Sequence, residues 1–405
     1  MTIGIDASRA NRDFKTGTEW YSYYLITNLV KIDKENKYIL YSDKPLNRAF
    51  LNDLDLDNNK NVKVKVLEWP FKYFWTMGRL SLEMIFRRPD VLFVPAHSLP
   101  LFFPKKTINT IHDIAFISNQ SIYGQEVLSS SSNRVDKFLR FLVKIFTLGR
   151  YNFKSIDYLK WSTKFALKRA RKIITVSHFT KNDILKNYKK VKVDKIKVVY
   201  NGFPNNIYHL ISDEASMNNV LRRYGIEEPF LLYIGRMERK KNIYNLIEGF
   251  AYFKENNKDS REKLVLIGSA GFGYDEMRYM IEELCLENDV IILGWVDEVD
   301  LPFIFNKAQI FIFPSLYEGF GIPVLQAMAC GAPVLLSNIE VLQEVAQDNA
   351  LFFDRFDPID LSEKISNILN NEDLRRELIS KGLSHSKNFS WEKCARETLA
   401  EINSL

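Results

Sequence analysis

Cysteine, histidine and long apolar runs are scarce in this chain of 405 residues. Its three cysteines, Cys285, Cys330 and Cys394, lie far apart and its histidines form no cluster, which argues against a disulfide framework and a structural zinc site. The first residues, Met1 to Asp6, include an acid where a signal peptide needs an apolar run, and no apolar stretch is long enough to cross a bilayer. We therefore expect a cytoplasmic protein that is soluble or lies on the inner face of the cell membrane.

Charge of one sign is also in only slight excess, because 56 basic and 50 acidic side chains give a net charge of +6. Basic residues far outnumber acids between Arg134 and Lys197, whereas the stretch from Glu340 to Asp373 is acidic. A basic N-terminal half favours an anionic surface or substrate. No nucleic-acid-binding motif accompanies this charge, so nucleic acid is not an expected partner.

Short β-branched runs alternate with amphipathic helical patterns along the chain, which is typical of a parallel sheet with crossover helices. The predicted strands form two sets, before and after a turn-rich segment at 201–206. The first set is Ile3–Ile5, Tyr38–Tyr41, Val62–Leu67, Val91–Val94, Thr107–Ile111, Ile173–Val176 and Ile196–Val199. The second set is Phe230–Ile234, Lys263–Ile267, Val290–Leu293, Ile310–Phe313 and Pro333–Leu336.

The pattern predicts an α/β protein with two doubly wound Rossmann-like domains that face each other across a cleft. We place the N-terminal domain at 1–205, the C-terminal domain at 206–385, and a last helix within 386–405 that packs back on the N-terminal domain. Ligands of such sheets gather beyond the carboxyl ends of the strands. The loops after the strands are therefore the expected place for the chemistry.

An apparent insertion at about 118–160 interrupts the alternation. Residues 135–148 have apolar side chains at helical spacing with cations largely opposite, and further cations follow up to Arg169. Residues 134–169 form either a basic amphipathic surface that meets anionic lipid headgroups or a helix that covers the N-terminal core. The pattern alone does not separate these two interpretations.

The most informative stretch is 310–333, in which a buried strand ends at Pro314, a loop with glycines follows, and Pro323 opens a helix. Gly319 and Gly321 let backbone N–H groups approach a ligand closely, and a helix start favours an anion. Glu318 can accept hydrogen bonds from sugar hydroxyls. Taken alone, however, the glycines favour a purely structural strand, turn and helix.

Residues 314–321 (PSLYEGFG) resemble the hallmark of the retaining glycosyltransferases of family 4 (glycosyl transferases group 1), which have the GT-B fold. The resemblance implies that Glu318 binds the donor sugar, beside Gly319, Phe320 and Gly321. A second family glutamate, which holds the ribose hydroxyls, is Gln326 here. An amide oxygen still accepts a hydrogen bond but lacks the charge, so we expect a weakened or shifted nucleotide contact.

A second motif begins where a predicted strand ends in Gly235, because Arg236 and Lys241 follow it five residues apart. Fixed cations stabilise the negative charge that builds on a departing diphosphate. The segment is similar to the family's Gly-Arg…Lys-Asn motif, which makes Arg236 and Lys241 diphosphate ligands with an electrostatic catalytic role. Arg239 and Lys240 between them fit a solvated charge run.

Three N-terminal positions extend the resemblance. His112 follows a buried strand, and although a lone histidine is more often structural, residues 112–116 resemble an element whose histidine contacts the donor sugar. The segment around His97 resembles one at the acceptor side. Gly17 stands where the family's backbone approaches the diphosphate, and Glu19 stands where a second glycine is common, so we expect Glu19 to face the acceptor.

Residues 294–296 resemble the loop that contacts the base, which assigns Trp295 and Val296 to the donor site. The resemblance runs from Ile3 to about Asp357. It implies transfer of a hexose of the mannose or glucose type from a GDP- or UDP-linked donor to a saccharide or lipid-linked saccharide, as in surface polysaccharide assembly. We expect no metal or other cofactor, since Asp55–Asp57 is more typical of a turn than of a metal site.

Two alternatives stay open. One is a phosphorylase or epimerase of the same fold. The other is a nucleotide-sugar-binding protein without efficient turnover, which the departure at Gln326 leaves possible.

Overall fold

The computed structural model describes residues 1–70, 74–118 and 155–405. It divides into two compact units: unit 1 comprises Met1–Asn201 with Trp391–Leu405, and unit 2 comprises Gly202–Ser390. The division falls slightly before the predicted boundary, and the last helix belongs to unit 1. Of the predicted basic stretch 134–169, only the part from residue 155 onward lies within the described residues.

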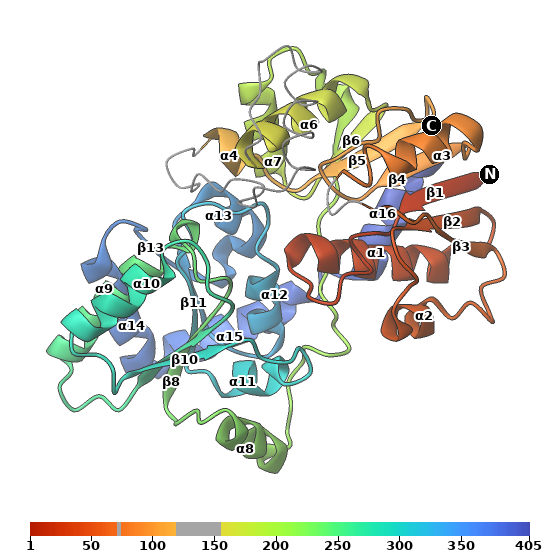
Figure 1. Cartoon of the computed structure of the whole chain (residues 1–405). Helices are drawn as coiled ribbons and strands as arrows, with labels where there is room; N and C mark the ends of the chain where they lie inside the picture. The colour runs from red at the N-terminus through yellow and green to blue at the C-terminus, as the bar shows by residue number, and fades with distance from the viewer. Residues whose placement is uncertain (71–73, 119–154) are drawn as a thin grey trace. The chain divides into compact units, whose positions relative to one another are not determined.

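Unit 1 is built on a parallel sheet of seven strands in the order β3-β2-β1-β4-β5-β6-β7 (Figure 1). The order reverses at β1, which pairs with β2 on one side and β4 on the other. In doubly wound sheets such a reversal is where ligands bind. The strands are β1 (Thr2–Asp6), β2 (Lys37–Ser42), β3 (Val62–Val66), β4 (Val91–Val94), β5 (Thr107–Ile111), β6 (Lys172–Thr175) and β7 (Ile196–Val198).

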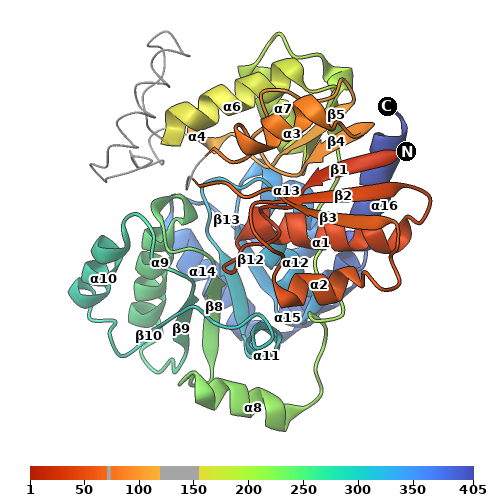
Figure 2. The ribbon, with the colours of Figure 1, turned by 45° about the vertical axis from the view of Figure 1, so that its right-hand side comes forward.

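Helices cover both faces of this sheet (Figures 1 and 2). One face carries α1 (Gly17–Ile32), α2 (Arg48–Leu54) and α16 (Trp391–Asn403). The other carries α3 (Arg79–Phe86), α4 (Ala115–Ser118), α6 (Ser155–Arg169) and α7 (His178–Asn187), with the short η1 (Val193–Lys195) before β7. A buried apolar cluster joins α3, α6 and α7 to the strands, with Leu80, Ala166 and Ile184 among its members.

Unit 2 repeats the plan with six parallel strands in the order β10-β9-β8-β11-β12-β13. The strands are β8 (Phe230–Ile234), β9 (Lys263–Ile267), β10 (Val290–Gly294), β11 (Ile310–Phe313), β12 (Val334–Ser337) and β13 (Leu351–Phe353). The sequence patterns did not predict β13, which is only three residues long and pairs with β12 at the edge of the sheet. The predicted α/β class with two doubly wound sheets is confirmed.

The helices of unit 2 also lie on both faces of its sheet (Figure 1). They are α8 (Glu214–Arg223), α9 (Ile243–Asn256), α10 (Tyr274–Glu283), α11 (Leu301–Lys307), α12 (Ile322–Ala329), α13 (Glu340–Ala346), α14 (Pro358–Asn370) and α15 (Glu372–Ser386), with η2 (Arg239–Lys241) and η3 (Gln347–Asn349). Helices α9 and α14 approach so closely that a Cβ on Gly249 would lie 2.7 Å from Leu361 Cδ2. Within the described ranges, no helix has the length and apolar content needed to cross a membrane.

Trp391 anchors α16 on unit 1. Its ring stacks on Tyr24 with centroids 5.6 Å apart and meets the edge of Tyr21 at 5.9 Å, and it is 4% exposed. We expect Trp391→Ala to lower the free energy of unfolding by about 3–5 kcal/mol, because it opens a cavity between α1 and α16. Trp391 Nε1 is buried without a hydrogen-bond partner, so Trp391→Phe, the matched control, keeps most of the packing and costs far less. Denaturant unfolding of both variants measures the difference, and equal losses would contradict this account of α16.

Candidate active site

The loop between β11 and α12 in unit 2 has the conformation that its glycines predict. Gly321 adopts a φ of 103° as the residue that caps α12, where a residue with a side chain would be strained. A Cβ there would also lie 3.0 Å from Leu342 Cδ2. Phe320 is buried, with its ring 6.1 Å from that of Phe389. These contacts fix the loop that presents Glu318 and Gly319.

Glu318 meets Lys241 at the carboxyl edge of the sheet. Lys241 Nζ lies 2.5 Å from Glu318 Oε1, and both side chains are largely buried, at 14% and 13% exposure. Ser315 Oγ donates to the same carboxylate oxygen at 2.7 Å, a contact that the sequence analysis did not anticipate although Ser315 and Glu318 are three residues apart. Two residues predicted from separate motifs therefore form one ion pair.

The backbone ties these two loops together as well. Leu316 N donates to Lys240 O at 2.9 Å, and Lys241 Nζ lies over the ring of Phe313 at 5.3 Å from its centroid. The loop after β8 and the loop after β11 are thus held side by side, because β8 and β11 are neighbouring strands. A strand pairing distant in sequence brings Lys241 to Glu318.

Arg236 lies on the same edge but is more open to solvent. Its side chain is 49% exposed, and its guanidinium lies 3.6 Å from Glu238. Below it, the buried Tyr233 hydroxyl donates to Arg236 O at 3.2 Å, and a Cβ on Gly235 would lie 2.6 Å from that hydroxyl. Burial, with Glu318 and Glu238 nearby, raises the pKa of Tyr233 well above its usual range, so the phenol stays a neutral donor. Gly235 is therefore required by the packing beneath Arg236.

The remaining predicted donor residues lie along the same sheet edge. Trp295 follows β10 and is 51% exposed, whereas its neighbour Val296 is buried. Gln326 lies on α12 and is partly exposed. In unit 2, the predicted donor residues thus sit on the loops after β8, β10 and β11 or on the helix that follows β11.

In unit 1 the two predicted histidines lie together, with ring centroids 5.8 Å apart. Each binds the other's loop: His97 Nε2 is 2.9 Å from Asp113 O, and His112 Nε2 is 3.2 Å from Pro95 O. Since backbone carbonyls only accept, both Nε2 atoms must carry a proton. The histidines therefore connect the loops after β4 and β5, and the structural interpretation of His112 gains support beside the functional one.

Burial lowers the pKa of His112 to about 4, and the neighbouring His97 acts in the same direction. Tyr21 packs edge-on against its ring with centroids 4.6 Å apart. The ring is consequently neutral at physiological pH, with Nε2 as its donor. A neutral imidazole can hydrogen-bond a sugar hydroxyl but supplies no fixed positive charge.

Glu19 forms the capping box of α1, because its carboxylate accepts from Thr16 N at 3.3 Å and from Thr16 Oγ1. Its other oxygen lies 3.2 Å from Arg9 Nη1. Gly17 begins the same helix, and a Cβ there would meet no atom within 4 Å. Nothing in unit 1 itself therefore requires glycine at 17, whereas the carboxylate of Glu19 has a structural role.

Among the described residues, no group of three or more His, Cys, Asp or Glu side chains has an arrangement that could hold a metal ion. Asp55 ends α2 with a φ of 45° and accepts from Asn58 Nδ2 at 2.8 Å. This geometry is that of a turn, as expected for the Asp55–Asp57 segment.

Comparison with known proteins decides the family. Residues 16–205 match Glycosyltransferase Family 4, and residues 220–385 match Glycosyl transferases group 1. The chain is 33% identical over 261 residues to O-antigen chain mannosyltransferase B of Escherichia coli, which is 64% of this chain and 67% of that protein. The chain belongs to glycosyltransferase family 4. Matches to two further glycosyltransferases span 58% and 60% of their length.

Solved structures show the fold of this glycosyltransferase. Sucrose-phosphate synthase from Thermosynechococcus elongatus superposes with a TM-score of 0.72 at 18% identity, covering 100% of this chain and 98% of the other. Anabaena HepE in complex with UDP-glucose gives a TM-score of 0.68 at 16% identity, with coverage of 100% and 99%. Both likenesses confirm the predicted GT-B fold for this glycosyltransferase.

The neutral state of His112 gives a pH dependence. In the unfolded chain its pKa returns to about 6.5, so the unfolded chain binds more protons than the folded one between about pH 4 and 6.5. We expect the contribution of His112 to the free energy of unfolding to be complete above this window and to be lost as the pH falls through it. Histidine proton shifts measured by NMR should show His112 titrating near 4. In His112→Gln, the matched control, unfolding should lose part of this pH dependence; an unchanged pH profile, or titration of His112 near 6.5, would contradict the assignment.

Proposed function

We propose that this glycosyltransferase moves a hexose, of the mannose or glucose type, from a GDP- or UDP-linked donor to a saccharide or lipid-linked saccharide, with retention of anomeric configuration. The observation that carries the proposal is the Lys241–Glu318 pair, with Arg236 on the same sheet edge. In this proposal Lys241 binds the diphosphate and Glu318 binds the sugar hydroxyls, and the two side chains are in contact. In a nucleotide sugar the diphosphate and the sugar hydroxyls lie next to each other, so neighbouring side chains can bind both.

The chemistry follows from these charges. When the bond between the sugar C1 and the phosphate oxygen breaks, negative charge builds on the departing diphosphate, and Arg236 and Lys241 stabilise it. The acceptor oxygen forms the new bond to C1 from the same face, and its proton passes to the departing phosphate oxygen. Glu318 orients the sugar through its hydroxyls. Because two cations supply the electrostatic stabilisation, we propose that no metal is essential.

The acceptor class rests on the relatives. The Escherichia coli protein is named an O-antigen chain mannosyltransferase, which supports a role in polysaccharide assembly with a mannosyl donor. UDP-glucose is the ligand of the Anabaena structure, so both donor bases belong in a screen. Binding of a nucleotide sugar without efficient turnover is the alternative that the departure at Gln326 leaves open.

Replacing Glu318 tests the site. We expect Glu318→Gln and Glu318→Ala to lower transfer by about 10²–10³-fold, because the carboxylate that orients the sugar and neutralises Lys241 is lost. The assay follows nucleotide release and glycoside formation by the purified protein with GDP-mannose or UDP-glucose, in EDTA, and NMR of the product reads the anomer. Glu340→Gln, at an exposed glutamate of α13 in the same unit, is the matched control.

Full activity in Glu318→Ala would refute the site. Donor binding without release of nucleotide in the wild-type chain would favour the binding-protein alternative. Activity that EDTA abolishes and a divalent cation restores would refute the metal-free proposal, and inversion at C1 would refute retention.

We also propose a cytoplasmic location on an anionic membrane surface, supported by an apolar and basic patch on unit 1. Helix α3 exposes Phe86 (80%) with Leu82 and Ile85, and the loop between β4 and β5 exposes Phe102 (53%) with Leu101. Leu101 N donates to Ser81 Oγ at 2.7 Å, so the loop and the helix adjoin. The exposed cations of these two segments are Arg87, Arg88, Lys105 and Lys106.

Helix α6 adds to the basic character of this region. Phe103 in the same loop meets Phe165 of α6 edge-on at 6.1 Å, and α6 exposes Lys164, Lys168 and Arg169. Exposed aromatic side chains among cations fit the boundary between headgroups and acyl chains of an anionic bilayer. The positive charge of the patch is complementary to an anionic bilayer and does not favour binding to a neutral one.

Vesicle flotation tests this patch. We expect the wild-type chain to float with vesicles that contain phosphatidylglycerol and not with phosphatidylcholine alone, and the double variant Phe86→Ser, Phe102→Ser to bind at least about tenfold less, since it loses buried apolar area. The matched control is Phe356→Ser, at a 70% exposed phenylalanine of unit 2. Equal flotation of all three proteins, or no flotation of the wild type, would rule the patch out.

A further inference from the structure

The loop after β8 carries a carboxylate, Glu238, that has no part in the proposed chemistry. It lies between two cations: Glu238 Oε2 is 3.6 Å from Arg236 Nη1, and Glu238 Oε1 is 3.4 Å from Lys240 Nζ. The side chain of Glu238 is 17% exposed and that of Lys240 is 25% exposed, so Lys240 is less open to solvent than the predicted charge run implies. Each oxygen of one carboxylate thus faces a cation at the edge of the candidate diphosphate site.

The loop after β9 fixes the backbone on which Glu238 stands. Met237 N donates to Ser269 O at 2.9 Å and Gly271 N donates to Met237 O at 2.9 Å, so the two loops continue the pairing of β8 with β9. A Cβ on Gly271 would lie 2.8 Å from Glu238 Cβ and 3.2 Å from Arg236 Nε. Glycine at 271 therefore leaves room for the side chains of Glu238 and Arg236 to lie together over this loop.

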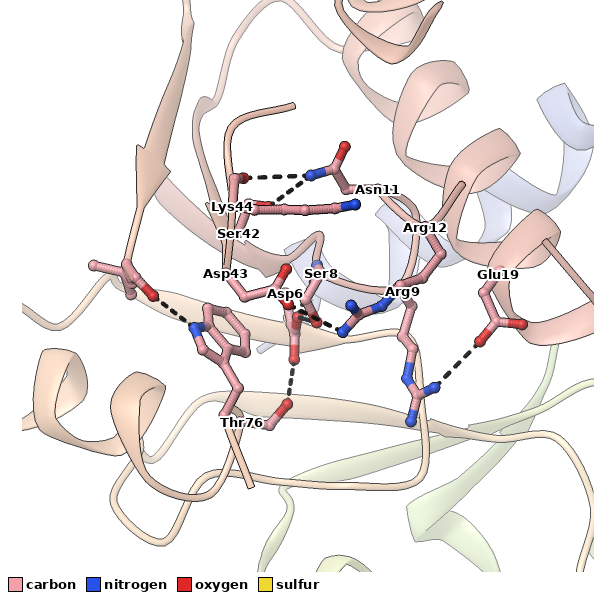
Figure 3. Close-up of polar contacts among 12 residues, drawn as sticks. Asp6, Ser8, Arg9, Asn11, Arg12, Glu19, Ser42, Asp43, Lys44 and Thr76 are labelled. Carbon is pink, nitrogen blue, oxygen red and sulfur yellow. Dashed lines mark hydrogen bonds and ion pairs between the residues drawn. The ribbon is translucent and has the colours of Figure 1, made fainter. Parts of the chain in front are cut away.

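The carboxylate of Glu238 has no comparable anchor. Within the described part of the chain no neutral hydrogen-bond donor contacts it, and its two cations lie beyond the usual length of a hydrogen bond. Figure 3 shows a fixed carboxylate for comparison: Asp6 accepts from Ser8 Oγ at 2.6 Å and from Thr76 Oγ1 at 2.9 Å. Charge alone thus holds the Glu238 carboxylate in place, and another anion can displace it.

Glu318, the other carboxylate at this sheet edge, is held more firmly. Lys241 Nζ lies 2.5 Å and Ser315 Oγ 2.7 Å from its Oε1. Both Glu318 and Glu238 raise the pKa of Tyr233, so both carboxylates lie near the hydroxyl of that residue. The two carboxylates therefore share one cluster of cations, and they differ in how tightly they are bound to it.

A diphosphate at Arg236 enters a place where Glu238 already neutralises the guanidinium. The two anions repel each other and compete for the same positive charge, so the carboxylate lowers the affinity of the site for any diphosphate. This applies to the donor and to the nucleoside diphosphate that remains after transfer. Because the product must leave before a second donor binds, a weaker diphosphate site favours turnover.

We propose that Glu238 is a displaceable counter-anion of the diphosphate site, which competes with the nucleotide for Arg236 and limits inhibition by the nucleoside diphosphate product. The inference rests on the proposed function, because it requires that Arg236 bind the diphosphate. Glu238 contacts no sugar and takes no part in the chemical step. Its effect is on affinity alone, through the charge that it shares with Arg236 and Lys240.

Nucleotide affinity of the full chain tests the inference. The probes are UDP and GDP, titrated by calorimetry into the wild type and into Glu238→Gln, which keeps the size of the side chain and removes its charge. We expect Glu238→Gln to bind the preferred diphosphate about tenfold more tightly, because Arg236 and Lys240 lose the anion between them. In about 1 M NaCl this gain should shrink, since salt screens exposed charges. Damage to the fold would lower the affinity instead.

Glu276→Gln is the matched control, because it removes the same charge from a glutamate that lies 3.4 Å from Arg239 of the same motif. It should leave the affinity within about twofold of the wild type, as expected for an exposed ion pair. Glu238→Asp keeps the charge and should stay closer to the wild type than Glu238→Gln does. In the transfer assay, product inhibition should strengthen in Glu238→Gln by the same factor as the affinity.

Three results would overturn the inference: equal affinity of Glu238→Gln and the wild type, weaker binding by Glu238→Gln, or equal tightening in Glu276→Gln. Weaker binding would mean that Glu238 orients Arg236 for the diphosphate. Failure of the proposed function looks different. In that case the wild type binds neither UDP nor GDP, whereas binding that Glu238→Gln does not strengthen refutes only the counter-anion.

Discussion

The contact between Lys241 and Glu318 is the interaction on which the candidate active-site edge of unit 2 depends. Each side chain is largely removed from water, and a buried charge is costly unless an opposite charge and hydrogen bonds accompany it. Lys241 supplies the charge, Ser315 donates to the same carboxylate, and the bond from Leu316 N to Lys240 O holds the two loops together. The glycines at 235 and 321 then serve this arrangement, since they let the backbone pass where a side chain would collide.

In unit 1, hydrogen bonds from two histidines connect neighbouring loops. His97 and His112 each donate to a carbonyl of the other's loop, and burial keeps His112 unprotonated. The loops after β4 and β5 are therefore held together by hydrogen bonds between side chains and backbone. Around them the exposed cations are matched by carboxylates, most clearly at Arg9 and Glu19.

Much of the fold and many positions of the candidate site could be predicted from the sequence, because they depend on local sequence patterns. The alternation of strands and helices predicted the fold class and nearly every strand. The motifs predicted that Glu318, Arg236, Lys241, His112 and His97 follow strands, which the structure confirms, whereas their chemical roles stay predictions. Strand β13 was not predicted, because a strand of three residues is too short to show the alternation of apolar and polar side chains. That Glu19 faces the acceptor stays a prediction. The sequence analysis missed its capping role, although Thr16 and Glu19 have capping-box spacing.

The sequence by itself determined which residues stand at the carboxyl ends of strands, since strand periodicity and the turn that follows are encoded within a few neighbouring residues. Only the tertiary structure decided which of these ends meet. Lys241 and Glu318 are brought together by the pairing of β8 with β11, and Glu238 lies against Gly271 because β8 also pairs with β9. Strand order depends on packing across the whole sheet, and no local pattern specifies it.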